Sequence, residues 1–314
     1  MSGIWIMKSI AYFAILFLLV APATAQELFC TDGSGASSKI GRCDLAGGYQ
    51  MTLVSSGLTG ADGIRVDVAG GKLYWAEQGG NIQRANLDGS DVEVIVAAGG
   101  NPHAVALDLT AGKVYWTELA AKRICRANLD GTDIELVIAA NSADGLAVDP
   151  VGGKVYGSRG NAVRRANLNG TRNELVANAS SPHGLALDIA AGKIYWTAIG
   201  SGRVQRVNMD GTGTIEDLVT GLSMPLDIGL DLLPGKMYWT ELGGGGSLKR
   251  ADLNGANVQT VLGAGVSAPF GVAVSPTLPP ATMPALPLGG VIVMALLMLL
   301  AVALTLARNP GRAR

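Results

Sequence analysis

A five-residue string of the type LYWAE recurs five times in the 314-residue chain, and this repeat constrains the fold more than any other feature. The copies lie at residues 73–77, 114–118, 155–159, 194–198 and 237–241, at spacings of 41, 41, 39 and 43 residues. A string ending in Asp precedes each copy, and strings of the types RANLDG and VEVIVAA follow it. Self-similarity at a period of about 40 residues is typical of propellers and solenoids.

The four strings of each repeat have the length and composition of β-strands, because they are rich in β-branched and aromatic residues and are bounded by glycine. Asp-Gly or Asn-Gly pairs end the third string, at 88–89, 130–131, 169–170, 210–211 and 254–255. Such pairs strongly indicate a hairpin, since both turn residues must adopt positive φ. Each repeat therefore predicts four antiparallel strands, the size of one propeller blade.

The two ends of this region supply a sixth repeat. ELFCTD (27–32), KIGRCDLAG (39–47) and QMTLVSS (50–56) match the second, third and fourth strings, and FGVAVS (270–275) matches the first. We therefore predict an all-β domain over residues 26–275, a six-bladed β-propeller of four-stranded antiparallel blades. Its first blade is closed by the N- and C-terminal strands, which leaves no frayed sheet edge.

The YWTE and RANLDG strings and the six-fold count resemble the LDL-receptor class B (YWTD) repeat over essentially all of residues 27–275. The resemblance implies a six-bladed β-propeller that binds protein ligands and is not an enzyme. Three copies depart from the pattern, at Phe29-Cys30, at Gly157-Ser158-Arg159 and at Ala198, which replaces the acid.

Aromatic and charged residues recur at equivalent positions, which favours packing and bracing over ligand sites. Ten of the domain's twelve aromatic residues occupy the second string, where each ring is expected to fill the space between blades. Arg occurs in the third string of all six repeats, and Asp ends the first string of five. We predict that these charges form hydrogen-bonded braces at the strand ends.

The segments outside the propeller predict export and anchoring. Residues 1–25 have the features of a signal peptide, with Lys8 before an apolar run and Ala23-Thr24-Ala25 as the cleavage site; an uncleaved anchor is the alternative. Residues 276–287 form a linker with five prolines. The uncharged run 288–307 is long enough for a transmembrane helix, at ~1.5 Å per residue. The Arg-rich tail 308–314 is then cytoplasmic by the positive-inside rule.

The string MPALPLGG, followed by an apolar run and arginines, resembles the IPTL-CTERM class of bacterial sorting tails, related in layout to PEP-CTERM. This resemblance implies export through the inner membrane of a Gram-negative-type bacterium, with a membrane-anchored or cell-surface location. It also implies a sorting or processing enzyme as a partner. A plain single-pass anchor has the same layout and remains the alternative.

One position breaks the repeat. The residue five before the end of each first strand lies where a propeller opens to its central channel, and the six copies are Asp62, His103, Asp144, His183, Leu226 and Phe270. The two histidines are the only ones in the chain. We predict that Asp62, His103, Asp144 and His183 form a ligand-binding mouth; the alternative is that Asp and His merely suit this turn. We predict no metal and no cofactor.

The predicted function is a non-catalytic module that binds protein or small-ligand partners at the cell envelope. No Ser, Cys or Thr stands beside an evident general base, as nucleophilic catalysis requires. One alternative is a lactonase- or lyase-like envelope enzyme with an axial site, because PHGL (182–185) is similar to turns of streptogramin-type lyases. Another is a structural surface protein. A net charge of −1 provides no basic surface for nucleic acid.

Cys30 and Cys43 are thirteen positions apart on neighbouring predicted strands and are a candidate disulfide. Export permits such a bond. The alternative is a pair of small buried apolar residues.

Overall fold

The computed structural model describes residues 27–33, 35–45, 50–139, 143–263 and 266–275. The predicted signal peptide, linker, membrane helix and tail (1–25, 276–287, 288–307 and 308–314) lie outside the described residues. Among the residues that are described, no helix has the length and apolarity needed to cross a membrane. Residues 26–277 form one compact unit.

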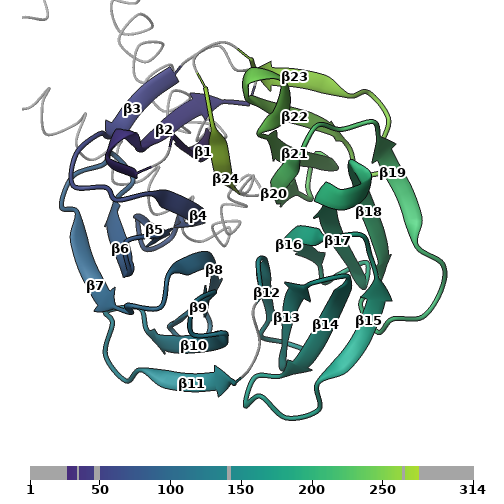
Figure 1. Ribbon diagram of the computed structural model, residues 1–314, viewed down its shortest axis with the longest axis horizontal. Coiled ribbons are helices and arrows are strands. Elements are labelled where there is room, and N and C mark those ends of the chain that lie inside the picture. Colours follow the sequence, from purple (N-terminus) through teal and green to yellow (C-terminus); the bar gives the residue numbers. More distant parts are fainter. Residues whose placement is uncertain (1–26, 34, 46–49, 140–142, 264–265, 276–314) are drawn as a thin grey trace, which may run out of the picture. The chain divides into compact units, whose positions relative to one another are not determined.

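Six four-stranded antiparallel sheets follow one another around a central channel, as predicted (Figure 1). Blade 1 contains β24 (Pro269–Val274), β1 (Glu27–Asp32), β2 (Lys39–Asp44) and β3 (Gln50–Val54). Blade 2 contains β4 (Ala61–Asp67), β5 (Lys72–Glu77), β6 (Asn81–Asn86) and β7 (Glu93–Ala97). Blade 3 contains β8 (Pro102–Asp108), β9 (Lys113–Glu118), β10 (Arg123–Asn128) and β11 (Glu135–Ile138).

The second half of the ring repeats this order. Blade 4 contains β12 (Leu146–Asp149), β13 (Lys154–Arg159), β14 (Ala162–Asn167) and β15 (Glu174–Asn178). Blade 5 contains β16 (Pro182–Asp188), β17 (Lys193–Ala198), β18 (Arg203–Asn208) and β19 (Glu216–Thr220). Blade 6 contains β20 (Pro225–Asp231), β21 (Lys236–Glu241), β22 (Ser247–Asp252) and β23 (Gln259–Leu262). Single 3₁₀ turns occur at η1 (Gly35–Ser37), η2 (Ile199–Ser201) and η3 (Gly243–Gly245).

The ring closes where the C-terminal strand of the domain joins the N-terminal one. β24 pairs antiparallel with β1, with Leu28 opposite Val274 and Phe29 opposite Ala273. The Ser275 backbone N–H donates to the Glu27 carbonyl at 2.9 Å and extends the ladder by one bond. The predicted closure of the first blade is confirmed.

Aromatic rings pack between neighbouring blades, which confirms their structural role. All four tryptophans of the ring, Trp75, Trp116, Trp196 and Trp239, are at most 1% exposed. One core cluster joins Tyr74 of blade 2 to Trp116 of blade 3. Large rings bury ~150–250 Å² each, so this inter-blade layer is a major stabilising element of the ring.

In blades 1, 4, 5 and 6 the hydroxyl of the residue after the Trp position connects adjacent inner strands, whereas blade 2 has Ala76 at this position. Thr240 Oγ1 accepts from the Asp227 N–H at 3.1 Å and donates to the Phe270 carbonyl of the next blade at 2.8 Å. Ser158 makes the same two bonds, to the Gly145 N–H and the His183 carbonyl. The departure of blade 4 from the repeat pattern therefore retains this connection.

The repeated arginines are braces, but their partners differ from the prediction. Arg84 pairs with Glu93 on the fourth strand of its own blade and donates to the Leu129 carbonyl of the next blade at 2.7 Å. The Asp at the end of the first strand instead caps the adjacent turn, as where Asp67 accepts from the Gly70 N–H at 2.8 Å. In blades 2 to 5 the bracing acid lies on the neighbouring outer strand because it is directly opposite in the β-ladder. In blade 1 Arg42 instead pairs with Glu27 of β1, and in blade 6 the partner of Arg250 is Gln259.

Cys30 and Cys43 are free, buried thiols in the structure. Cys30 lies opposite Gly41 and Cys43 lies opposite Leu28, so the two cysteines are diagonal rather than directly opposed. Burial raises the pKa of each thiol to about 12. This arrangement matches the alternative of two small buried residues, and the disulfide remains a prediction that thiol labelling before and after reduction would check.

Candidate functional site

The channel has two ends, which the strand directions define. We call the face where the innermost strands begin the top face, and the face where they end the bottom face. Pro102 at the start of β8 pairs with Glu118 at the end of β9, so the loop after each second strand also lies on the top face. The Asp-Gly turns after the third strands consequently lie on the bottom face.

The structure brings all four predicted site residues together near the top face. They line one small cavity with Asp227, and we call these five residues the polar cluster: Asp62, His103, Asp144, His183 and Asp227. The cavity measures about 10 Å³, which is room for about one water. The side chains of the cluster and their neighbours therefore fill the channel at this level.

His103 is held at both ring nitrogens. Its Nδ1 lies 2.9 Å from the Asp144 carbonyl oxygen, which only accepts, so Nδ1 carries a proton. Its Nε2 lies 3.1 Å from Asp62 Oδ2, so this contact also needs one proton, on either the imidazole or the carboxyl group. Burial raises the pKa of Asp62, and the charge of His103 opposes that shift.

His183 is neutral at neutral pH. Its Nδ1 donates to the Leu226 carbonyl at 3.2 Å, and its ring lies 5.1 Å from the ring of His103, edge to face. Burial, with a smaller contribution from the charge of His103, lowers the pKa of His183 to about 4. The two histidines therefore differ in their electrostatic environment although they occupy equivalent positions in their repeats.

Two residues of the site were missed by the sequence analysis. Arg65 Nη1 lies 2.9 Å from Asp227 Oδ2, and this ion pair spans the channel between blades 2 and 6. The signal was available in the repeat, because every other inner strand has Ala or Gly at the position of Arg65 and Gly or Ala at that of Asp227. An alignment of the six repeats shows both residues, because each is the one exception at its aligned position.

The cluster has the chemistry of a hydrogen-bonded structural network more than that of a metal centre. In the part of the chain that is described, no group of three or more His, Cys, Asp or Glu side chains is placed to hold a metal ion. Two pairs dominate the network: Asp62 with His103 and Arg65 with Asp227.

The low pKa of His183 predicts that acid destabilises the fold. The unfolded chain binds a proton at this histidine below its ordinary pKa of about 6.5, whereas the folded chain does so only near pH 4. The free energy of unfolding should therefore fall as the pH drops from 7 to 4, by about 3 kcal/mol from this group. Asp62 and Asp144 act in the opposite sense, since burial raises their pKa values.

Comparing the wild type with His183→Asn isolates this contribution, because Asn keeps a donor for the Leu226 carbonyl and does not titrate. Urea unfolding at several pH values measures the difference. The wild type should lose more stability than the variant between pH 7 and 4. Equal slopes for the two proteins would contradict the assignment.

Comparison with known proteins agrees with this architecture. The family model for the low-density lipoprotein receptor repeat class B matches residues 235–275. Low-density lipoprotein receptor-related protein 5 of Mus musculus is 36% identical over 93 residues, which cover 29% of this chain and 6% of that protein. Low-density lipoprotein receptor-related protein 1 of Pyricularia oryzae is 32% identical over 105 residues, covering 30% of this chain and 34% of that protein.

Solved structures match over most of the chain. A chain from the crystal structure of a nidogen/laminin complex superposes with a TM-score of 0.73 at 22% identity, covering 81% of this chain and 99% of the other. TolB from Acinetobacter baumannii gives a TM-score of 0.67 at 16% identity, covering 86% and 71%. The chain is therefore a six-bladed β-propeller whose residues 235–275 match the low-density lipoprotein receptor class B repeat.

Proposed function

We propose that this propeller is a non-catalytic binding module that recognises a protein partner through its top face. The observation that carries the proposal is the filled channel beneath that face, where the polar cluster leaves a cavity of about 10 Å³. A small substrate has no room there. Recognition at this end consequently falls to the loops around the channel, which a rigid scaffold holds in place.

One top-face loop has a residue whose conformation is costly. Met224 precedes β20, is 47% exposed and has a φ of 53°. Asn101 and Ser181 hold the equivalent positions before β8 and β16, with φ of 56° and 49°. Left-handed backbone is unfavourable for a long apolar side chain, and strain of this kind concentrates at functional sites. An exposed methionine also suits an interface, because it adapts to the shape of a partner.

The setting of the module is the cell envelope, as the sequence predicts. The signal peptide (1–25), the proline-rich linker (276–287) and the apolar run (288–307) support an exported domain tethered by its C-terminus. The nidogen/laminin structure is that of a protein complex, so a chain of this fold is found in such a complex.

Met224→Gly tests the proposal, since Gly removes the exposed side chain and suits the positive φ. The full chain with and without this change is used to capture partners from an envelope extract. We expect a partner that untagged protein competes away and that Met224→Gly loses, while stability is unchanged or rises by ~0.5–1 kcal/mol.

Arg172→Gly is the matched control. Arg172 also has positive φ, at 55°, but lies in a turn on the bottom face. It should gain similar stability and keep the partner. Capture that survives Met224→Gly would place recognition elsewhere, and turnover of lactones or esters by the purified protein would favour an enzyme instead.

A further inference from the structure

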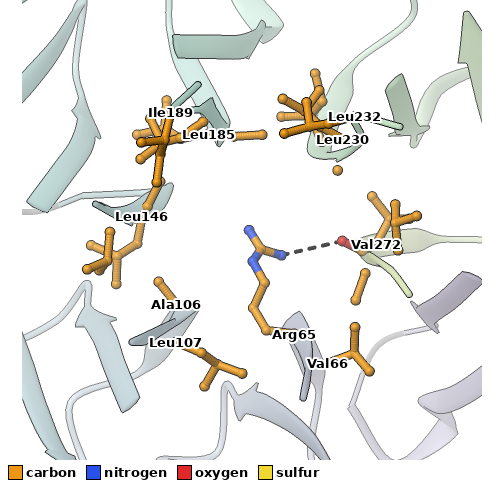
Figure 2. A pocket seen from close by; sticks show the side chains of 18 of the residues that line it. Arg65, Val66, Ala106, Leu107, Leu146, Leu185, Ile189, Leu230, Leu232 and Val272 are labelled. Carbon is orange, nitrogen blue, oxygen red and sulfur yellow. Dashed lines mark hydrogen bonds between the residues drawn. The ribbon is translucent and has the colours of Figure 1, made fainter. Parts of the chain in front are cut away.

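A second and larger cavity occupies the other end of the channel. It opens toward the bottom face, has a volume of about 320 Å³ and receives residues from all six blades (Figure 2). This volume lies at the lower end of the range for small-molecule sites. The cavity is separate from the proposed protein-binding loops, which lie on the top face.

The wall of this cavity is apolar at successive levels. The inner strands contribute small residues at one level, namely Ala106, Ala147, Ala186, Gly229 and Ala273. The next level is formed by larger aliphatic side chains, among them Leu107, Leu187 and Leu230. An aliphatic chain that lies against these side chains buries apolar surface, and this burial favours its binding.

Arg65 is the one charged residue among the described residues that line the cavity. Figure 2 shows its guanidinium group in the middle of the ring of aliphatic side chains. Nη1 donates to the Ile64 carbonyl at 2.7 Å and to Asp227 Oδ2 at 2.9 Å, and Nη2 lies 3.4 Å from Asp227 Oδ1. Asp227 therefore holds the Nη1–Nη2 edge.

The other edge of this guanidinium is free. Nε–H and the second Nη2–H have no hydrogen-bond partner among the described residues. These two N–H groups form a planar fork whose geometry matches a carboxylate, which can accept both bonds at once. A fixed fork inside an apolar wall specifies a ligand with one anionic head and an aliphatic body.

We propose that this cavity binds a medium-chain aliphatic monocarboxylate. Its carboxylate lies on the Nε–Nη2 edge of Arg65, and its alkyl chain runs along the aliphatic wall toward the bottom face. The opening supports an alkyl chain, because Leu109, Ile189 and Leu232 at the rim are 48%, 41% and 45% exposed. A volume of about 320 Å³ holds roughly ten water-sized groups, which sets the ligand at medium length.

Calorimetric titration tests the ligand class with three soluble probes. The full chain, and in parallel the compact unit of residues 26–277, is titrated with octanoate, hexanoate and 1-octanol. Octanoate should bind one to one, and hexanoate more weakly by about fourfold per missing methylene. The neutral alcohol should bind about tenfold more weakly than octanoate, because it lacks the charge-assisted pair of hydrogen bonds.

Two variants separate the contribution of the carboxylate head group from that of the alkyl chain on the cavity wall. Arg65→Lys keeps a cation for Asp227 but removes the fork, so it should weaken octanoate about tenfold and leave 1-octanol unchanged. Ala106→Leu fills part of the cavity while it keeps Arg65 in the chain, and it should weaken both probes. Ala106 occupies in β8 the position that Arg65 occupies in β4, so a longer side chain fits the backbone there.

Three results would overturn the proposal. The first is no binding of octanoate below its micelle concentration. The second is equal affinity for octanoate and 1-octanol, which indicates an apolar cavity without head-group recognition. The third is octanoate binding that Ala106→Leu leaves unchanged in a protein whose unfolding transition is intact, since the ligand then lies elsewhere.

Discussion

A chain that ends at Ala268 is expected to lose its cooperative unfolding transition. This truncation removes β24, which pairs with β1 and places Val272 and Ala273, 0% and 3% exposed, in the core. Without it, one blade lacks its innermost strand and β1 becomes an exposed edge. A lost strand costs on the order of the whole stability of a domain, which is about 5–15 kcal/mol.

The matched control is a chain that ends at Ser275. It retains β24 and lacks only residues beyond the described domain, so it should unfold in a single transition like the full chain. Circular dichroism during urea denaturation distinguishes the two truncations. A cooperative transition of normal midpoint in the shorter chain would show that ring closure by β24 contributes little to stability.

The repeat predicted most of the fold, for a physical reason. Each copy contains the strand pattern and an Asp-Gly or Asn-Gly pair in the loop between its third and fourth strands, so local sequence and blade structure agree on the strands. The expected positive φ at both residues of each pair was wrong: only the glycines adopt it, and in blade 2 the loop spans residues 87–92 because β6 ends at Asn86 and β7 begins at Glu93. The closing strand was also predictable, because FGVAVS (270–275) supplies the string that the first blade lacks. The segments outside the propeller were predicted from sequence patterns that the described structure does not contain.

The candidate site was only partly predictable, because a repeat argument gives weight to what recurs. His103 and His183 were found because one aligned position of the repeat varies, and both histidines occupy it. The structure places their rings 5.1 Å apart. Arg65 and Asp227 are exceptions at two different aligned positions, and nothing at either position indicates that they meet across the channel. Their contact depends on the ring geometry, which places β4 and β20 on the two sides of β24.

That placement gives the ion pair a structural role where β24 closes the ring. Asp227 Oδ2 accepts from the Val272 N–H at 3.0 Å, and Arg65 Nη1 lies 3.4 Å from the Val272 carbonyl oxygen. The pair therefore contacts both backbone groups of one residue on the channel edge of β24. The one strand contributed by the C-terminal end of the domain is thus held from the channel side as well as by β1.

Asp227→Ala is accordingly expected to cost about 3–5 kcal/mol of unfolding free energy, the range for breaking a buried ion pair by removing one partner. The side chains of Arg65 and Asp227 are only 21% and 10% exposed, so water compensates poorly. The substitution leaves the guanidinium without its carboxylate and the Val272 N–H without its acceptor. Urea unfolding at neutral pH measures the loss.

Glu174→Ala is the matched control, because Glu174 pairs with Arg165 but is 46% exposed. Such a surface pair is worth ~0–1 kcal/mol, so the control should change stability little. Asp227→Asn should fall between the two, since its side-chain carbonyl can still accept from the Val272 N–H while the charge is lost. A cost for Asp227→Ala no larger than that of Glu174→Ala would contradict the assigned role of the pair in holding β24.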